Sequence, residues 1–127
     1  MSLTYSNSQS NTGVCTLTAP ASNNVTWNLT SLDVSMAGPT VGPNAVLTIY
    51  DGAIGGTVLY RCFLNGPNQP GIPSGGSVGW TQKIILPTDA NNHPGIQAIT
   101  GNAMNIQVVG TGANVVCINA RLLDGLP

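Results

Sequence analysis

The one histidine of the sequence, His93, precedes Pro94 in a loop-like stretch, and the carboxylate nearest to it along the chain is Asp89. A histidine beside a carboxylate could act in general acid–base catalysis, and a nucleophile could join the two in three dimensions. The chain has no nucleophile elbow to present a serine, and its other aspartates fall at strand or turn positions. We therefore expect no catalytic residue and a protein that is not an enzyme.

Metal ligands are equally sparse. Zinc requires three or four histidine, cysteine or carboxylate ligands, and one histidine with three widely spaced cysteines does not supply them. The cysteines, Cys15, Cys62 and Cys117, each lie in an apolar run, which predicts buried thiols rather than disulfides. Residues 89–92 offer oxygen ligands for calcium but only one carboxylate, so a plain turn is the better interpretation. No metal or cofactor is expected.

Glycine-containing turns have structural explanations. Asp51 and Gly52 stand between two strand-like runs, where the aspartate would cap the turn and the glycine would supply a positive φ. The pairs Gly55-Gly56 and Gly75-Gly76 precede neither a helix nor a Lys-Ser/Thr pair, which argues against a phosphate-binding loop.

The two tryptophans, Trp27 and Trp80, could form a sugar-stacking platform. Each alternates with apolar or threonine neighbours in a strand-like run, so core packing is the favoured interpretation, followed by a subunit interface. Arg61 and Arg121 also lie within strands, where an arginine must reach solvent or a partner. With Tyr5 and Trp80, they are the candidate interface residues.

Charge is scarce: the 127 residues contain three Lys or Arg and four Asp or Glu, which is 6% charged residues and a net charge of −1. Nucleic-acid binding depends on clustered cations, and Arg61, Lys83 and Arg121 are well separated. No apolar run is long enough to span a membrane, and the first residues do not have the pattern of a signal peptide. We expect neither nucleic acid nor a membrane as a partner.

The elements that position these residues read as strands, because Val, Ile, Thr and Asn alternate between turn dipeptides and no helical period is visible. The apolar phase of residues 25–36 shifts midway, which predicts a bulge at Thr30-Ser31. A long strand that bends in this way could serve two sheets. The remaining strands are predicted at residues 14–18, 46–50, 57–64, 78–86, 96–100, 103–109 and 114–123.

Two hairpins are predicted, one joining residues 46–50 to 57–64 and one joining 96–100 to 103–109 through Gly101-Asn102. Both faces of 57–64 are largely apolar, which places this strand centrally or under a partner chain. About eight strands with short connections indicate an all-β protein, an antiparallel β-sandwich of jelly-roll-like type. Residues 14–127 would form this single domain, and the polar residues 1–13 a flexible or partner-binding arm.

Three segments carry a family resemblance. Residues 95–116 resemble the closing hairpins of small structural proteins of tailed-phage virions, and residues 47–52 followed by 56–59 are similar to the same group. The resemblance implies a head decoration (cement) protein, commonly oligomeric, that binds the major capsid protein on the capsid exterior and bridges capsomers. Such proteins have no catalytic residues to transfer.

This resemblance predicts a virion protein assembled in the host cytoplasm as a homodimer or homotrimer. An uncharged surface agrees with it, because burying such a surface against protein avoids the desolvation of unpaired ions. The alternative is a carbohydrate- or receptor-binding β-sandwich module of a phage tail or spike, which would need exposed aromatic side chains.

Overall fold

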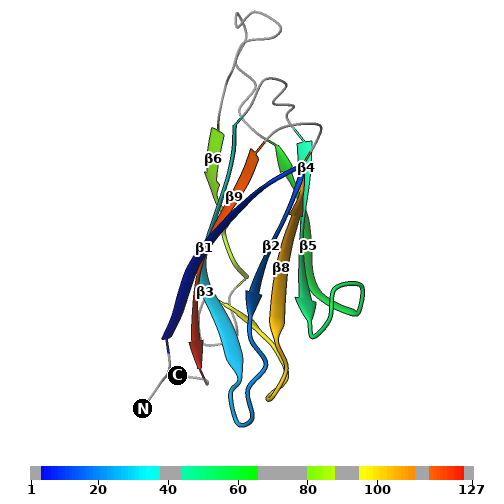
Figure 1. Cartoon of the computed structure of the whole chain (residues 1–127). Coiled ribbons are helices and arrows are strands. Elements are labelled where there is room, and N and C mark those ends of the chain that lie inside the picture. The colour runs from blue at the N-terminus through cyan, green and yellow to red at the C-terminus, as the bar shows by residue number, and fades with distance from the viewer. Residues whose placement is uncertain (1–3, 38–43, 66–79, 88–94, 111–114, 125–127) are drawn as a thin grey trace, which may run out of the picture.

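The computed structural model of the chain describes residues 4–37, 44–65, 80–87, 95–110 and 115–124. Regular structure within these ranges consists of nine strands and no helix, which confirms the all-β prediction (Figure 1). These ranges contain no helix that is long and apolar enough to cross a membrane. The strands are β1 Thr4–Thr12, β2 Val14–Ala19, β3 Trp27–Ala37, β4 Asn44–Asp51, β5 Thr57–Asn65, β6 Trp80–Lys83, β7 Ile96–Gln97, β8 Met104–Val109 and β9 Val115–Asp124.

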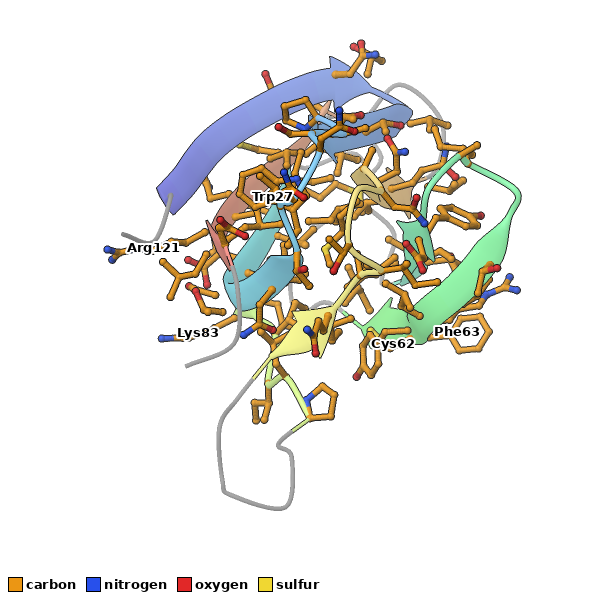
Figure 2. All side chains as sticks on the ribbon, turned by 90° about the horizontal axis from the view of Figure 1, so that it is seen from below. Trp27, Cys62, Phe63, Lys83 and Arg121 are labelled. Atoms are coloured by element: carbon orange, nitrogen blue, oxygen red, sulfur yellow. The ribbon has the colours of Figure 1, made fainter. Side chains whose placement is uncertain are left out.

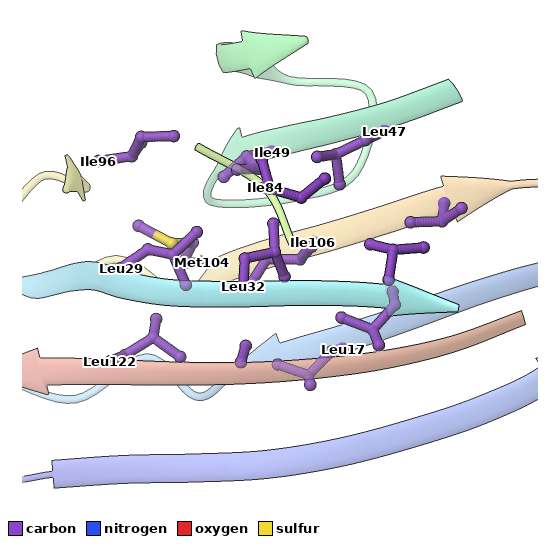
Figure 3. Packing of buried hydrophobic residues seen from close by; sticks show 14 of the residues in the cluster. Leu17, Leu29, Leu32, Leu47, Ile49, Ile84, Ile96, Met104, Ile106 and Leu122 are labelled. Carbon is purple, nitrogen blue, oxygen red and sulfur yellow. The ribbon is translucent and has the colours of Figure 1, made fainter. Parts of the chain in front are cut away.

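The strands form two antiparallel sheets that pack as a sandwich, as predicted. Sheet A has the order β1-β9-β3-β6, with the short β7 also paired to β3, and sheet B has the order β2-β8-β4-β5. The core lies between the sheets, where inward side chains from β3 meet those from β4 and β8 (Figure 3). Leu32, Ile49 and Ile106 are fully buried, and burial of each such side chain contributes about 1.5–3 kcal/mol.

The predicted bulge in β3 is confirmed. The register of β3 against β9 shifts between Leu29 and Ser31. Because of this shift, the odd-numbered Leu29 and the even-numbered Leu32 both face the core and are 0% exposed. Both halves of β3 nevertheless remain in sheet A, so the expectation that this strand serves two sheets is wrong.

The chain passes between the sheets at Gly13 instead. Thr4–Thr12 pairs with β9 in sheet A, and Val14–Ala19 pairs with β8 in sheet B. Gly13 has a φ of 79°, a conformation that glycine adopts without steric cost, and it joins the two strands (Figure 1). This glycine therefore makes the sandwich corner that the sequence analysis assigned to β3.

The N-terminal segment also differs from its prediction as an arm. Thr4–Thr12 is the edge strand of sheet A, in continuous antiparallel register with β9. Apart from Tyr5, it consists of Ser, Asn, Thr and Gln and lacks apolar alternation, so the pattern gave no strand signal. The backbone groups of an edge strand can pair with a neighbour whatever the side chains are, and β9 supplies that neighbour. Residues 1–3 lie outside the described ranges.

One predicted hairpin forms and the other does not. β4 and β5 pair through the loop after Asp51, in which Gly52 and Gly55 have φ values of 83° and 87°. β7 and β8, by contrast, belong to different sheets, because β7 pairs with β3 while β8 pairs with β2 and β4. A turn does form where predicted, with the Asn102 N–H bonded to the Ile99 carbonyl at 3.0 Å, but it carries the chain between layers.

Candidate interaction surface

The residues that could have supported catalysis do not assemble within the described ranges. His93 and Asp89 both lie outside these ranges. Asp33 is on the β3–β9 ladder of sheet A, opposite Asn119, and Asp51 ends β4 in sheet B. The described part of the chain contains no group of three His, Cys, Asp or Glu side chains that could hold a metal ion.

Asp51 is a buried carboxylate, 8% exposed, that ties segments together. Its Oδ1 accepts hydrogen bonds from the Ile99 N–H at 3.2 Å and from Asn102 Nδ2 at 3.0 Å. We predicted that Asp51 caps its own turn. In the structure its carboxylate instead accepts bonds from the segment that crosses between the sheets. Gly52 has the positive φ predicted for it, and its carbonyl accepts a bond from Asn105 Nδ2 at 2.6 Å.

Trp27 is a core residue, which confirms the prediction of core packing for it. Its side chain is 4% exposed, and its indole Nε1–H donates to the Pro20 carbonyl at 2.8 Å. A buried indole with a satisfied N–H cannot serve as a sugar-stacking platform, which removes one of the two residues that the carbohydrate alternative would use. Trp80 begins β6, opposite Met36 on β3.

The three cysteines occupy different environments. Cys15 is buried, which confirms the prediction for this residue, whereas Cys62 and Cys117 are only half-buried. Burial raises the pKa of the Cys15 thiol, and the proximity of Cys117 adds to the effect. Burial likewise raises the pKa of Cys62, although a hydrogen bond from Tyr60 opposes this shift. None of the three takes part in a disulfide.

The four candidate interface residues do not form one patch. Arg121 is exposed on β9 in sheet A, opposite Ser31, whereas Arg61 is exposed on β5 in sheet B, opposite Thr48. Figure 2 shows Arg121 and Lys83 on one side of the molecule and Phe63 on the other. Tyr5 and Trp80 lie on β1 and β6, the two edge strands of sheet A.

The feature that sequence reasoning missed is an apolar row across the outer face of sheet B. Val14 is opposite Val109, Val109 is opposite Val46, and Val46 is opposite Phe63, so the row contains one residue from each strand. Val14 and Val109 are each 42% exposed, Val46 is half-buried, and Phe63 is 71% exposed. We call these four residues the apolar row.

Beyond the apolar row, this outer face is almost uncharged. The neighbouring row on this face, two residues further along each strand, contains Thr16, Gln107, Thr48 and Arg61, again one from each strand. Arg61 is the one charged residue that the described ranges place on this face. Sheet A carries Asp33, Lys83 and Arg121 in its ladders. The outer face of sheet B is therefore the candidate interaction surface, because apolar groups are accessible there and few ions must be desolvated.

Comparisons with known proteins assign no family. No family model matches the chain, and no curated protein matches it. Among solved structures, the K2 cleaved adhesin domain of Lys-gingipain aligns with a TM-score of 0.39 and 11% identity over 93% of this chain and 70% of that one. A structure of the Gx strain of infectious bursal disease virus aligns with a TM-score of 0.35 and 12% identity, over 98% of this chain and 37% of that one. A VP2 subviral particle of the same virus aligns with a TM-score of 0.36 and 11% identity, over 97% of this chain and 36% of that one.

Proposed function

We propose that this chain is a non-enzymatic structural protein of a tailed-phage virion, which binds the major capsid protein on the capsid exterior and stabilises the shell by bridging capsomers. The resemblance of residues 47–52, 56–59 and 95–116 to small virion proteins supports this class. The observation that carries the proposal is the apolar row on a nearly uncharged sheet face. Such a face suits a lasting contact with protein better than it suits a polyanion or a solvated ligand.

The energetics of that contact follow from the exposures. Full burial of a Val or Phe side chain contributes about 1.5–3 kcal/mol, and Val14 and Val109 each have 42% of their surface left to bury. Each valine would therefore add about 1 kcal/mol and Phe63, at 71% exposed, about 2 kcal/mol. The polar neighbours keep hydrogen-bonding capacity without the desolvation cost of ions.

Stabilisation of the shell would arise by mass action. A ligand that binds the assembled shell and not its dissociated parts stabilises the shell by RT ln(1 + [L]/Kd). This amounts to about 2.7 kcal/mol per site when the free protein is at a hundredfold excess over Kd. The function requires no chemistry, only a complementary surface that exists once neighbouring capsomers have come together.

The test compares two substitutions of the same residue type. Val109→Asp places a charge in the middle of the apolar row, whereas Val115→Asp places one at an equally exposed valine of sheet A, 44% against 42% exposed. With decoration-free capsids of the phage that encodes the chain, we expect wild type and Val115→Asp to co-sediment and to raise the capsid melting temperature. Val109→Asp should do neither. Failure of the wild-type protein to bind would overturn the proposal, and equal binding by Val109→Asp would remove the sheet B face from it.

A further inference from the structure

Among the strands that the structure describes, β5 is an open edge of sheet B. It is the last strand in the order β2-β8-β4-β5 and pairs with β4 on one side. Its exposed side chains include Val58 and Phe63, which are 48% and 71% exposed, and Arg61 is its one charge. A long apolar edge strand with few charged residues can pair with another strand, because its outward backbone groups have no partner in the sheet.

Two hydrogen bonds identify which backbone groups of sheet B point in which direction. The Gly110 N–H donates to the Gly13 carbonyl at 2.8 Å, so even-numbered residues of β8 bond to β2. The Gly52 N–H donates to the Ala103 carbonyl at 2.8 Å, so odd-numbered residues of β8 bond to even-numbered residues of β4. The two bonds agree, since strands in an antiparallel sheet bond alternately to either neighbour.

The same alternation continues to β5. The odd-numbered residues of β4 bond toward β5, and Leu47, which is one of them, is opposite Cys62. Tyr60, Cys62 and Leu64 therefore use their N–H and C=O groups on β4. The N–H and C=O groups of Arg61 and Phe63 point to the open edge, where a further strand can accept and donate two bonds with each of them.

The charge on β5 selects the register in which a second copy could pair. An antiparallel pair of identical strands lies on a two-fold axis, and an axis at Arg61 would place two guanidinium groups opposite each other. An axis at Cys62 instead places Arg61 of each copy opposite Phe63 of the other, where a guanidinium can stack on the ring. This register pairs residues 59–65 of both strands, whereas an axis at Phe63 pairs only residues 61–65 of β5.

We propose that two copies of this chain pair antiparallel through β5, about a two-fold axis at Cys62, and so extend sheet B to eight strands. The net charge of −1 opposes this association little. The apolar rows of the two copies come to lie on one continuous outer face. The dimer does not depend on the proposed virion function, although a doubled face would suit a protein that bridges neighbouring capsomers.

The cysteine on the axis makes the register directly testable. Cys62 faces its counterpart as a non-hydrogen-bonded pair, for which Cα atoms are about 4.5 Å apart. Disulfides form at Cα separations of about 4.4–6.8 Å. Oxidation of the full-length protein with copper–phenanthroline, which takes up the two electrons released by two thiols, should therefore give a covalent dimer on a non-reducing gel.

Matched variants decide the outcome of the oxidation. Cys62→Ser should abolish the covalent dimer, whereas Cys117→Ser, at the other half-buried thiol, should leave it unchanged. A covalent dimer that persists in Cys62→Ser, or that disappears in Cys117→Ser, would overturn the proposed register. Absence of any cross-link in wild type would overturn it as well.

A second measurement tests the backbone pairing without the cysteine. Phe63→Pro removes an N–H that points to the open edge and spares those bonded to β4, while Phe63→Ala removes the ring and keeps the N–H. By sedimentation equilibrium we expect Phe63→Pro to raise the dimer dissociation constant about tenfold or more beyond Phe63→Ala, since each dimer loses two donors. Circular dichroism checks that the sandwich is retained.

Thr81→Pro is the control for this measurement. The Ile84 N–H donates to the Leu32 carbonyl, so by the same alternation the Thr81 N–H points to the open edge of sheet A. This variant should dimerise like wild type. A monomeric wild-type protein, or a Phe63→Pro protein that dimerises as well as Phe63→Ala, would contradict the proposal. A dimer that fails to bind capsids would overturn the virion function and leave this inference intact.

Discussion

Replacement of Asp51 by alanine should destabilise the sandwich where its two sheets are connected. The carboxylate is 8% exposed, and its Oδ1 accepts bonds from the Ile99 N–H at 3.2 Å and from Asn102 Nδ2 at 3.0 Å. These two bonds hold the end of β4 to the segment that carries the chain from sheet A to sheet B. Without the acceptor, both donors must find water, and the crossing segment is no longer tied to β4.

The magnitude follows from the two bonds. A hydrogen bond to a charged group contributes about 1.5–3 kcal/mol. The 3.2 Å bond is at the long end of the normal range and both bonds are only part-buried, so the lower half of that range applies to each bond. We expect Asp51→Ala to lower the free energy of unfolding by about 3–4.5 kcal/mol. Asp51→Asn, which retains an oxygen acceptor, should lower it by about half as much.

The assay is urea denaturation followed by tryptophan fluorescence, with Trp27 as the buried reporter. Asp33→Ala is the control, since Asp33 is a half-buried residue opposite Lys83, where a surface pair contributes at most about 1 kcal/mol. If Asp51→Ala unfolds within about 0.5 kcal/mol of Asp33→Ala, the two bonds do not hold the crossing segment, and the reasoning is refuted.

Two further predictions concern a glycine and a thiol. Gly95→Ala should lower the melting temperature more than Gly55→Ala. Both positions have positive φ, but a Cβ at Gly95 would lie 2.5 Å from Asn28 Oδ1, whereas nothing lies within 4 Å of a Cβ at Gly55. Equal melting temperatures of the two variants would contradict the close approach at Gly95. Because burial raises the pKa of Cys62, its neutral thiol persists to higher pH, so its alkylation by iodoacetamide, measured by mass spectrometry, should reach half its maximal rate at higher pH than alkylation of free cysteine. The same midpoint for both would contradict this.

Much of the architecture follows from local pattern. Alternation of apolar residues predicted the strands that contain the core, and the phase shift after Leu29 predicted the bulge in β3, because a side chain on the wrong face would be expelled from the core. Thr4–Thr12 escaped notice since its polar side chains carry no such signal. The prediction of a hairpin through Gly101 was wrong for another reason. A turn dipeptide indicates the local dihedral angles, but it does not indicate which sheet the next strand joins.

The candidate site depended on pairing that no local pattern contains. Arg61 and Arg121 were chosen because a charge inside a strand needs solvent or a partner, and both are exposed, but they lie in the ladders of different sheets. The apolar row joins Val14, Val46 and Phe63, which are far apart in the sequence, through three separate ladders. Val14 and Val46 looked like ordinary members of alternating strands, and Phe63 stood in a run that is largely apolar on both faces.

The sequence by itself determined the class of the protein: an all-β sandwich with few charges, no clustered cations and no evident catalytic motif. Those properties depend on residue types and on spacing along a strand, which decide what each face of a strand can bury. Only the tertiary structure decided which strands are neighbours, where the chain changes sheets and which edge stays open. The physical reason is that strands pair through backbone groups that all residues share, so side chains specify a face but leave the neighbour to the packing of the whole chain.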